Sequence, residues 1–361
     1  MPRPTLYVAI TNHGFGHATR TASVVAQIQQ LYPDVLIILV TAAPRWLLES
    51  YLPGEFIYRP RPLDIGVVQA DGITMDLPAT LERLQAIRQQ QRQLVRAEVE
   101  FIRQNRVNLV LADLPPLATA IAQAASIPGW MLGNFGWDFI YRDWGGEFIE
   151  MADWISECFS HCDRLFRLPF HEPMSSFPVI EDVGLTGATP RFSPEELRQQ
   201  LGLTAEQAKT VLLTFGGLGL QAIPYQNVQH FPDWQFLTCD RHAPTDLLNL
   251  LLVDGAKYRP ADLMPACGRI ISKPGYGTFS EACRLDVPIV TLTRSGFAES
   301  PVLLKGIQEY SHHQIIEPSE FFNDRWEFLG QPLQPPSQSN RLNKDGNQAI
   351  ANAVVSYLQK L

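Results

Sequence analysis

The pattern that most constrains this chain is a buried strand that runs into a glycine turn and then into a helix. In the C-terminal half, residues 270–284 read IISKPGYGTFSEACR: an apolar run ends at Lys273, a turn holds Gly275 and Gly277, and a helix-forming segment follows. The first N–H groups of such a helix lack intrahelical partners, and the helix dipole is positive there. A diphosphate can therefore bind at this turn, although an ordinary βα turn has the same pattern.

Side chains next to this turn fit the same kind of ligand. Thr278 and Ser280 supply hydroxyl donors, and Glu281 is placed to accept hydrogen bonds from the hydroxyls of a ribose beside the phosphates. These residues favour a nucleotide diphosphate over a plain structural turn, but the turn alone does not decide between the two.

A second unit of the same kind opens the chain. The apolar run Leu6–Thr11 is followed by NHGFGHATR at 12–20 and by a helical pattern. A dinucleotide fingerprint is not expected, because Thr19 occupies its third glycine position and the region about 20 residues on, at Val40 and Thr41, has no acid for a ribose. The chain also has no P-loop sequence, so NAD and P-loop nucleotide binding are not predicted.

Two histidines in this first loop are the candidate catalytic bases. His13 and His17 follow the first expected strand, at the edge where open α/β sheets bind ligands. A histidine there can take up a proton near neutral pH. It can equally pack or cap the turn, and we expect that of at least one of the two.

Apolar runs alternate with helix-forming segments along the chain, which indicates βαβ units and parallel sheets. A Pro-containing stretch divides the chain, and each half begins with a strand and a glycine loop. We therefore expect an α/β protein with two Rossmann-like domains that face a central cleft. The expected boundaries are an N-terminal domain over 1–170, a linker over 171–190, a C-terminal domain over 191–340 and a final helix over 341–361.

Polar and aromatic residues cluster after two expected strands of the N-terminal half. They lie near the carboxyl edge of the sheet and suit a sugar-like ligand, or they brace an interface between the domains. They are Asp113, Asn134, Trp137, Asp138 and Tyr141.

The composition of the chain excludes several classes of binding partner and site. Lys and Arg number 29 against 37 Asp and Glu, a net charge of −8 without a basic run, so nucleic acid is not an expected partner. No apolar stretch reaches the roughly 20 residues that span a bilayer, and no leader pattern opens the chain, so we expect a cytoplasmic protein. Five scattered cysteines argue against a disulfide framework, and Cys158, His161 and Cys162 lack a second pair at metal-finger spacing, so no metal site is expected.

Five motifs carry a family resemblance that spans nearly the whole chain. The paired glycine loops resemble GT-B glycosyltransferases, and the C-terminal half is similar to the sugar-donor domain of the N-acetylglucosaminyltransferase of peptidoglycan precursor synthesis. The motifs look most like the glycosyltransferase-like N-terminal part of plant L-arabinokinases. They are HGFGHATR at 13–20, VQADGIT at 68–74, NFGWDFIY at 134–141, KPGYGTFSE at 273–281 and FAESP at 297–301.

The resemblance implies a GT-B fold in which the N-terminal domain binds an acceptor and the C-terminal domain binds a nucleotide-sugar, expected to be a UDP-sugar. It implies that His13 or His17 is the base that takes the proton of the acceptor hydroxyl. It also implies no bound cofactor or metal, since no Asp-x-Asp motif occurs. Kinase activity is not implied, because the chain has no Gly/Ser-rich ATP loop. The implied residues on the sugar-donor side are Gly14, Gly16, Gly216, Gly217, Gly219, Lys273, Gly275, Gly277, Thr278, Ser280, Glu281 and Glu299.

Three functions fit these observations. The first is a metal-independent hexosyl- or pentosyltransferase that acts on a nucleotide-sugar and a hydroxyl acceptor. The second is a non-catalytic protein that binds a nucleotide-sugar or a sugar and has a regulatory role. The third is a nucleotide-sugar epimerase, which needs acid and base groups on both faces of the sugar ring.

Overall fold

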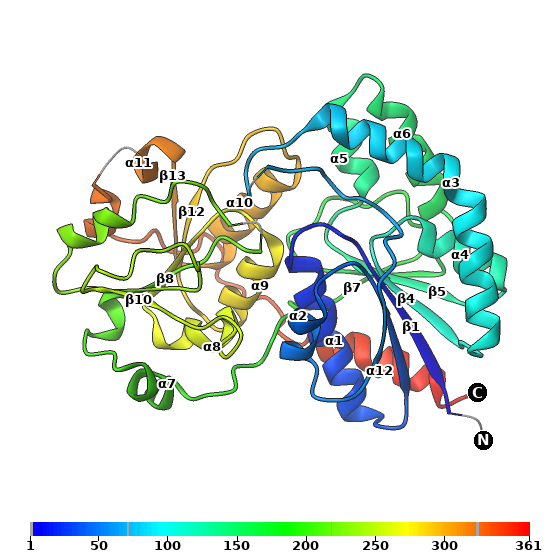
Figure 1. The fold of residues 1–361 in the computed structure, drawn as a ribbon, viewed down its shortest axis with the longest axis horizontal. Helices are drawn as coiled ribbons and strands as arrows, with labels where there is room; N and C mark the ends of the chain where they lie inside the picture. Colours follow the sequence, from blue (N-terminus) through cyan, green and yellow to red (C-terminus); the bar gives the residue numbers. More distant parts are fainter. Residues whose placement is uncertain (1–2, 71, 218, 323–324) are drawn as a thin grey trace.

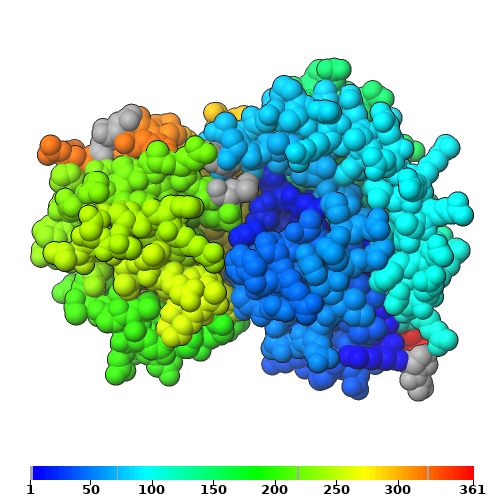
Figure 2. Space-filling model, viewed as in Figure 1, coloured from blue at the N-terminus to red at the C-terminus, as the bar shows by residue number. Residues whose placement is uncertain are grey.

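The computed structural model describes residues 3–70, 72–217, 219–322 and 325–361. Figure 1 shows two α/β domains side by side, the first in blue to green on the right and the second in green to orange on the left. Figure 2 shows the two lobes in contact along their boundary. Asp71 of the 68–74 motif and Leu218 of the second glycine loop lie outside the described residues.

In the described part of the chain, the first domain contains a seven-stranded parallel sheet with the order β3-β2-β1-β4-β5-β6-β7. Every residue of β1 is buried, as expected of a central strand covered by helices on both faces. The strands are β1 (Thr5–Ile10), β2 (Leu36–Val40), β3 (Ile57–Arg59), β4 (Leu109–Asp113), β5 (Gly129–Gly133), β6 (Arg164–Arg167) and β7 (Ile180–Asp182). The helices are α1 (Gly16–Leu31), α2 (Arg45–Tyr51), α3 (Leu77–Gln104), α4 (Leu117–Ala125), α5 (Trp137–Trp144) and α6 (Phe148–Phe159).

The second domain contains, within the described residues, a six-stranded parallel sheet with the order β10-β9-β8-β11-β12-β13. Its strands are β8 (Thr210–Leu213), β9 (Gln235–Thr238), β10 (Leu250–Leu252), β11 (Arg269–Ser272), β12 (Ile289–Leu292) and β13 (His313–Ile316). Its α-helices are α7 (Pro194–Leu201), α8 (Pro260–Leu263), α9 (Tyr276–Arg284), α10 (Glu299–Tyr310) and α11 (Pro318–Phe322). Short 3₁₀ turns are η1 (Gln207–Lys209), η2 (Tyr225–His230), η3 (Met264–Ala266) and η4 (Glu327–Gly330).

Strand register places the first loop beside the end of β4. Ile10, the last residue of β1, pairs with Asp113, the last residue of β4. The loop after β1 and the side chain of Asp113 therefore meet at the carboxyl edge of the first sheet, where ligands bind in folds of this kind.

The sequence did not predict where two elements pack. The expected linker, 171–190, contains β7, because Ile180–Asp182 pairs with β6 and extends the first sheet to its edge. The last helix, α12 (Gly346–Leu358), runs back to the first domain and packs on α1, as the red helix in Figure 1 shows. Its buried Ile350 and Val354 join an apolar cluster that includes residues of both domains, so α12 ties the two together.

Local sequence explains several helix ends. Ser193 and Glu196 form a capping box at the start of α7. Asp76 caps α3, whose buried face includes Leu84 and Ile102, while its Gln and Arg side chains point mostly outward. Within the described ranges, no helix combines the length and apolar character needed to cross a membrane.

Candidate active site between the two domains

A cavity of about 100 Å³ lies between the domains, at the carboxyl edges of both sheets. Five segments line it: the loop after β1 with the start of α1, Gln69 between β3 and α3, the loop after β8, the loop after β11 with the start of α9, and the loop from β12 to the start of α10. In Figure 2 a hollow on the visible face is bordered by the dark blue start of the chain. The two glycine loops expected from the sequence thus face one cavity.

Glycines allow close contact where the two domains touch. A Cβ on Gly217 would lie 2.3 Å from a ring carbon of Phe15, so the aromatic ring of the first loop packs directly on the backbone of the second. A Cβ on Gly277 would lie 3.3 Å from the Cα of Gly16, which brings the start of α1 against the start of α9. These close contacts bring the N-terminal loop next to the glycine turn at the start of α9.

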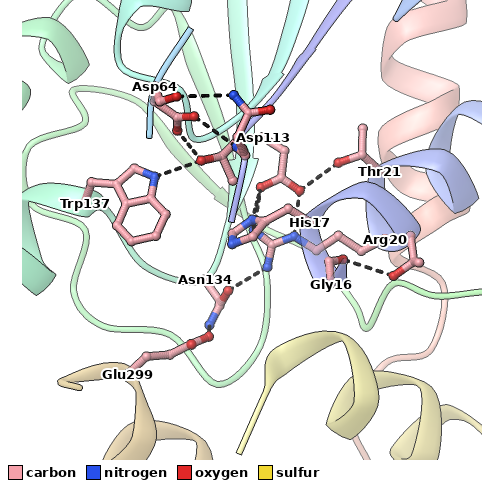
Figure 3. Close-up of polar contacts among 12 residues, drawn as sticks. Gly16, His17, Arg20, Thr21, Asp64, Asp113, Asn134, Trp137 and Glu299 are labelled. Carbon is pink, nitrogen blue, oxygen red and sulfur yellow. Dashed lines mark hydrogen bonds and ion pairs between the residues drawn. The ribbon is translucent and has the colours of Figure 1, made fainter. Parts of the chain in front are cut away.

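His17 is held by a buried network around Asp113 (Figure 3). Its Nδ1 lies 2.8 Å from Oδ1 of Asp113. The Arg20 guanidinium donates to both oxygens of that carboxylate, at 2.7 Å to Oδ2 and 2.6 Å to Oδ1, and the Thr21 hydroxyl donates to Oδ2 at 2.7 Å. Asp113 is completely buried and accepts all of these hydrogen bonds.

Electrostatics keep Asp113 ionised. Burial alone would raise the pKa of Asp113, but the charges of Arg20 and His17 and their hydrogen bonds hold it well below the usual value of an aspartate. An ionised carboxylate only accepts hydrogen bonds, so His17 Nδ1 carries a proton. Arg20 Nη2 is 3.0 Å from the same nitrogen, but it already has Oδ1 of Asp113 as its acceptor. In neutral His17 the free lone pair is therefore on Nε2.

A chain of polar contacts links this network to the second domain. Arg20 Nη1 donates to Oδ1 of Asn134 at 2.7 Å, and Nδ2 of Asn134 donates to Oε1 of Glu299 at 2.8 Å. Figure 3 shows Asn134 between the two. Glu299 is the first residue of α10 and lines the cavity. A ligand that engages Glu299 is thus connected through two side chains to Asp113.

His13 has a different environment. Its ring lies between Trp137 and Phe297, with centroids at 5.2 and 5.9 Å. The backbone N–H of Val67 donates to its Nδ1 at 3.3 Å. Burial, followed by the charges of His17, Arg294 and Lys273, lowers the pKa of His13 well below the usual histidine value. A neutral ring that accepts at Nδ1 carries its proton on Nε2, so His13 is placed to donate a hydrogen bond rather than to take a proton.

The start of α9, where the sequence predicts an anion site, lies at the cavity. Gly275 is its N-cap residue, and both Lys273 and Thr278 line the cavity. The expected glycines Gly14, Gly16, Gly216, Gly217 and Gly277 also line it. Gly219 lies beside it, with its carbonyl accepting a hydrogen bond from Gly72 N–H at 3.1 Å.

Ser280 and Glu281 point away from the cavity, because they lie one turn further along α9. The Ser280 hydroxyl donates to the Thr186 carbonyl at 2.6 Å. Oε1 of Glu281 accepts from the backbone N–H of Ala188 at 3.1 Å, and the residue is 5% exposed. Neither lines the cavity in this structure, so their expected contacts with phosphate and ribose stay predictions.

Burial, more than any other effect, raises the pKa of Glu281 to about 7. Since the folded state binds this proton more tightly than the unfolded chain, folding stability falls as the pH rises from about 4.5 to about 7. Glu281→Gln keeps an acceptor for Ala188 without the buried charge. We expect the variant to be more stable than the wild type by about 3 kcal/mol at pH 8 and equally stable at pH 4. Urea unfolding at both pH values measures this, and a variant that is less stable at pH 8 contradicts it.

The remaining three residues expected on the acceptor side make hydrogen bonds within the first domain. Trp137 Nε1 donates to the Thr11 hydroxyl at 3.2 Å. The Tyr141 hydroxyl donates to the Gly66 carbonyl at 2.6 Å. Asp138 accepts from Ser156 at 3.0 Å, on the side of α5 that faces α6. None of the three lines the cavity, so they support the loops around it.

Four residues in or behind the cavity were missed by the sequence reasoning. Arg20 lies one helical turn after His17, a spacing that could have suggested a shared contact. Arg294 and Phe297 follow β12 at the carboxyl edge of the second sheet, and the Arg294 guanidinium lies 4.3 Å from the centre of the Phe297 ring. Gln69 belongs to the VQADGIT motif of the family resemblance, but the motif did not predict a role for this side chain.

Solved structures with a similar fold are glycosyltransferases. CalG4, the calicheamicin glycosyltransferase, matches with a TM-score of 0.65 at 15% identity, and the match covers all of both chains. A Polygonum tinctorium UDP-glucosyltransferase capable of glucosylating indoxyl matches with a TM-score of 0.63 at 13% identity, over 100% of this chain and 93% of that one. Phytolacca americana UGT2, complexed with UDP-2-fluoro-glucose and pterostilbene, matches with a TM-score of 0.60 at 13% identity, over 100% and 94%. The chain has the GT-B fold, which confirms the expected fold class.

One relative has a higher sequence identity to this chain than the solved structures named above. The chain is 33% identical over 314 residues to L-arabinokinase from Arabidopsis thaliana, which confirms the expected resemblance. The aligned part covers 83% of this chain and 29% of that protein, so the chain spans about three tenths of the length of the curated relative it matches. No protein-family model matches the chain.

Proposed function

We propose that the protein is a metal-independent glycosyltransferase that moves a sugar from a nucleotide diphosphate, expected to be UDP, to a hydroxyl acceptor. The observation that carries the proposal is the His17–Asp113 pair, which faces the phosphate-binding start of α9 across one cavity. The UDP-sugar glycosyltransferases among the structures of similar fold support the same class of donor.

The geometry suits a direct displacement. Nε2 of His17 takes the proton of the acceptor hydroxyl while the hydroxyl oxygen attacks the anomeric carbon of the sugar. The bond from that carbon to the phosphate oxygen breaks, and the nucleoside diphosphate leaves with the electron pair. Asp113 holds the ring through Nδ1 and stabilises the imidazolium that forms.

Fixed positive charges match the leaving group. The diphosphate of a nucleotide-sugar carries two negative charges, and the cavity is lined by two cationic side chains from the second domain, Lys273 and Arg294. Together with the N–H groups at the start of α9, they can stabilise the departing diphosphate without a metal ion.

Loss of either cation should weaken binding of UDP. We expect Lys273→Met and Arg294→Met each to raise the dissociation constant for UDP by roughly tenfold, the scale of one charge-assisted contact to phosphate. Isothermal titration calorimetry in the presence of EDTA measures this. Lys305→Met on the exposed side of α10 is the matched control, and an equal loss in that variant would show a merely general effect of charge.

The proposal as a whole is tested by titrating the protein with UDP, other nucleotides and a panel of nucleotide-sugars, and then incubating any ligand that binds to detect slow hydrolysis. Saturable binding with hydrolysis supports the transferase and identifies its sugar donor. Absence of binding by every nucleotide and nucleotide-sugar contradicts it.

One observation favours a second candidate, a non-catalytic sensor of nucleotide-sugars. Arg20 bonds both oxygens of Asp113 and neutralises the carboxylate that would support a protonated His17. In a sensor the ligand would close the domains without turnover. Tight binding without hydrolysis, even with hydroxyl acceptors supplied, distinguishes the sensor from the enzyme.

A further inference from the structure

One polar atom in the wall of the cavity lacks a hydrogen-bond partner among the described residues. Gln69 lines the cavity, and its Nε2 is buried without an acceptor. Native proteins satisfy nearly all buried donors, because an unsatisfied one costs free energy. In the wall of a cavity, a bound ligand can supply the missing acceptor. The last torsion of a glutamine side chain is soft, so Nε2 can turn toward a ligand at little cost.

The backbone around Gln69 is fixed by hydrogen bonds. Gln69 and Met75 form an antiparallel bridge. The carbonyl of Val68 accepts from the N–H of Asp76 at 2.8 Å, and the N–H of Val68 donates to the Thr80 hydroxyl at 3.0 Å, which attaches the segment to the first turn of α3. The paired residues 68–70 and 72–76 are called the Gln69 hairpin below.

The Gln69 hairpin reaches from the first glycine loop to the second domain. Just before it, a backbone N–H donates to Nδ1 of His13 at 3.3 Å. Further along, the N–H of Gly72 donates to the Gly219 carbonyl at 3.1 Å, and a Cβ on Gly72 would lie 2.8 Å from Cδ of Lys273. Gln69 comes between these contacts along the chain, so its side chain belongs to the part of the wall that joins the histidine loop to Lys273.

This part of the wall is where the proposed function places the sugar. The sugar of a nucleotide-sugar is bonded to the diphosphate at its anomeric carbon, and the acceptor attacks the same carbon, so the sugar must lie between Lys273 and the base His17. The first domain offers two neutral donors there, His13 with its proton on Nε2 and Gln69, and Glu299 of the second domain offers an acceptor. Neutral donors and a carboxylate suit sugar hydroxyls, which both accept and donate.

We propose that Gln69 recognises the sugar of the nucleotide-sugar by donating a hydrogen bond from Nε2 to one of its hydroxyl oxygens. The inference rests on the proposed function and adds a specificity residue to it. Lys273 and Arg294 of the second domain then bind the diphosphate, while Gln69 of the first domain binds the sugar. UDP, which has no such sugar, gains nothing from Gln69.

Calorimetric titration of Gln69→Leu with UDP, UDP-glucose, UDP-galactose and UDP-xylose tests this. We expect the affinity for the UDP-sugar that the wild type binds most tightly to fall about fivefold, the scale of one hydrogen bond, and the affinity for UDP to change by less than about twofold. Lys273→Met is the matched comparison, because it should weaken both ligands by similar factors. Gln93→Leu, on the exposed side of α3, controls for the exchange of glutamine for leucine and should change neither affinity.

Thermal unfolding without ligand gives a second readout, which a merely structural role would move in the opposite direction. Because Nε2 makes no hydrogen bond to a described residue, leucine removes a buried polar atom and leaves no partner of that atom unsatisfied. We therefore expect the Tm of Gln69→Leu to equal or exceed that of the wild type. A Tm lower by several degrees would show that Gln69 stabilises the hairpin itself and would contradict the proposal.

The other binding results are equally decisive. Equal losses for UDP and the UDP-sugar in Gln69→Leu would assign the amide to the diphosphate, and no loss for either ligand would show that the amide does not contact the sugar. Both results overturn this proposal and leave the proposed function intact. A wild type that binds neither UDP nor any UDP-sugar contradicts the proposed function and removes this proposal with it.

Discussion

His17→Ala is expected to lower the turnover of a nucleotide-sugar by about 10³-fold, the usual contribution of a positioned general base. His17 lines the cavity, and Asp113 holds its Nδ1 at 2.8 Å, which leaves Nε2 to act as the base. Binding of UDP should change by no more than about twofold, because the phosphate contacts come from the second domain. Steady-state rates of UDP release, with calorimetry of UDP, measure the two effects.

His13→Gln is the matched comparison for this prediction. The ring of His13 accepts a hydrogen bond from Val67 at Nδ1, and its low pKa keeps it neutral, so we assign it no proton transfer from the acceptor. We expect a loss of less than about tenfold, since only a hydrogen bond and ring packing are removed. A larger loss for His13→Gln than for His17→Ala would reverse the assignment of the base.

Asp113→Asn is expected to have the largest effect on stability. The substitution leaves Arg20, which is 2% exposed, as a buried charge without its counter-ion. Breaking a buried pair on one side costs about 3 to 5 kcal/mol, so the free energy of unfolding should fall by that order. Turnover should fall as well, because His17 loses the group that sets its tautomer. Urea unfolding at pH 7 measures the first effect.

The double variant Arg20→Met with Asp113→Asn tests whether the lost stability of Asp113→Asn comes from the unpaired charge of Arg20. It removes both charges, so we expect it to recover much of the stability lost by the single substitution, as buried pairs often do when both members become neutral. In the wild type the pKa of Asp113 is held below its usual value of about 4, so the stability from the pair is present above that pH and is lost as the pH falls further. A double variant that is less stable than Asp113→Asn would contradict this account.

Much of the architecture follows from local sequence. Continuous apolar strands followed by glycine turns predict parallel sheets, and the position of a residue just after a strand predicts that it lies at the carboxyl edge. This reasoning placed His17 and Asp113 at one edge, because each follows or ends an expected parallel strand; in the structure the ends of those strands, β1 and β4, are adjacent. It could not place them in contact, since strand order is not readable from the sequence.

Other features depend on tertiary packing. Ser280 and Glu281 have the residue types of a nucleotide site, but the pitch of α9 turns both toward residues 186–188. Arg294 carries no motif, and its importance appears only where the two domains meet. β7 was hidden in a Pro-containing stretch because an edge strand of three residues has too few positions to show a pattern.

Release of UDP from UDP-sugars, with water as the acceptor and EDTA present, tests whether His17 is the base of a glycosyltransferase. We expect slow release by the wild type from at least one UDP-sugar that binds, and at least hundredfold slower release by His17→Ala. No release from any UDP-sugar that binds, or equal rates for the wild type and His17→Ala, would contradict it.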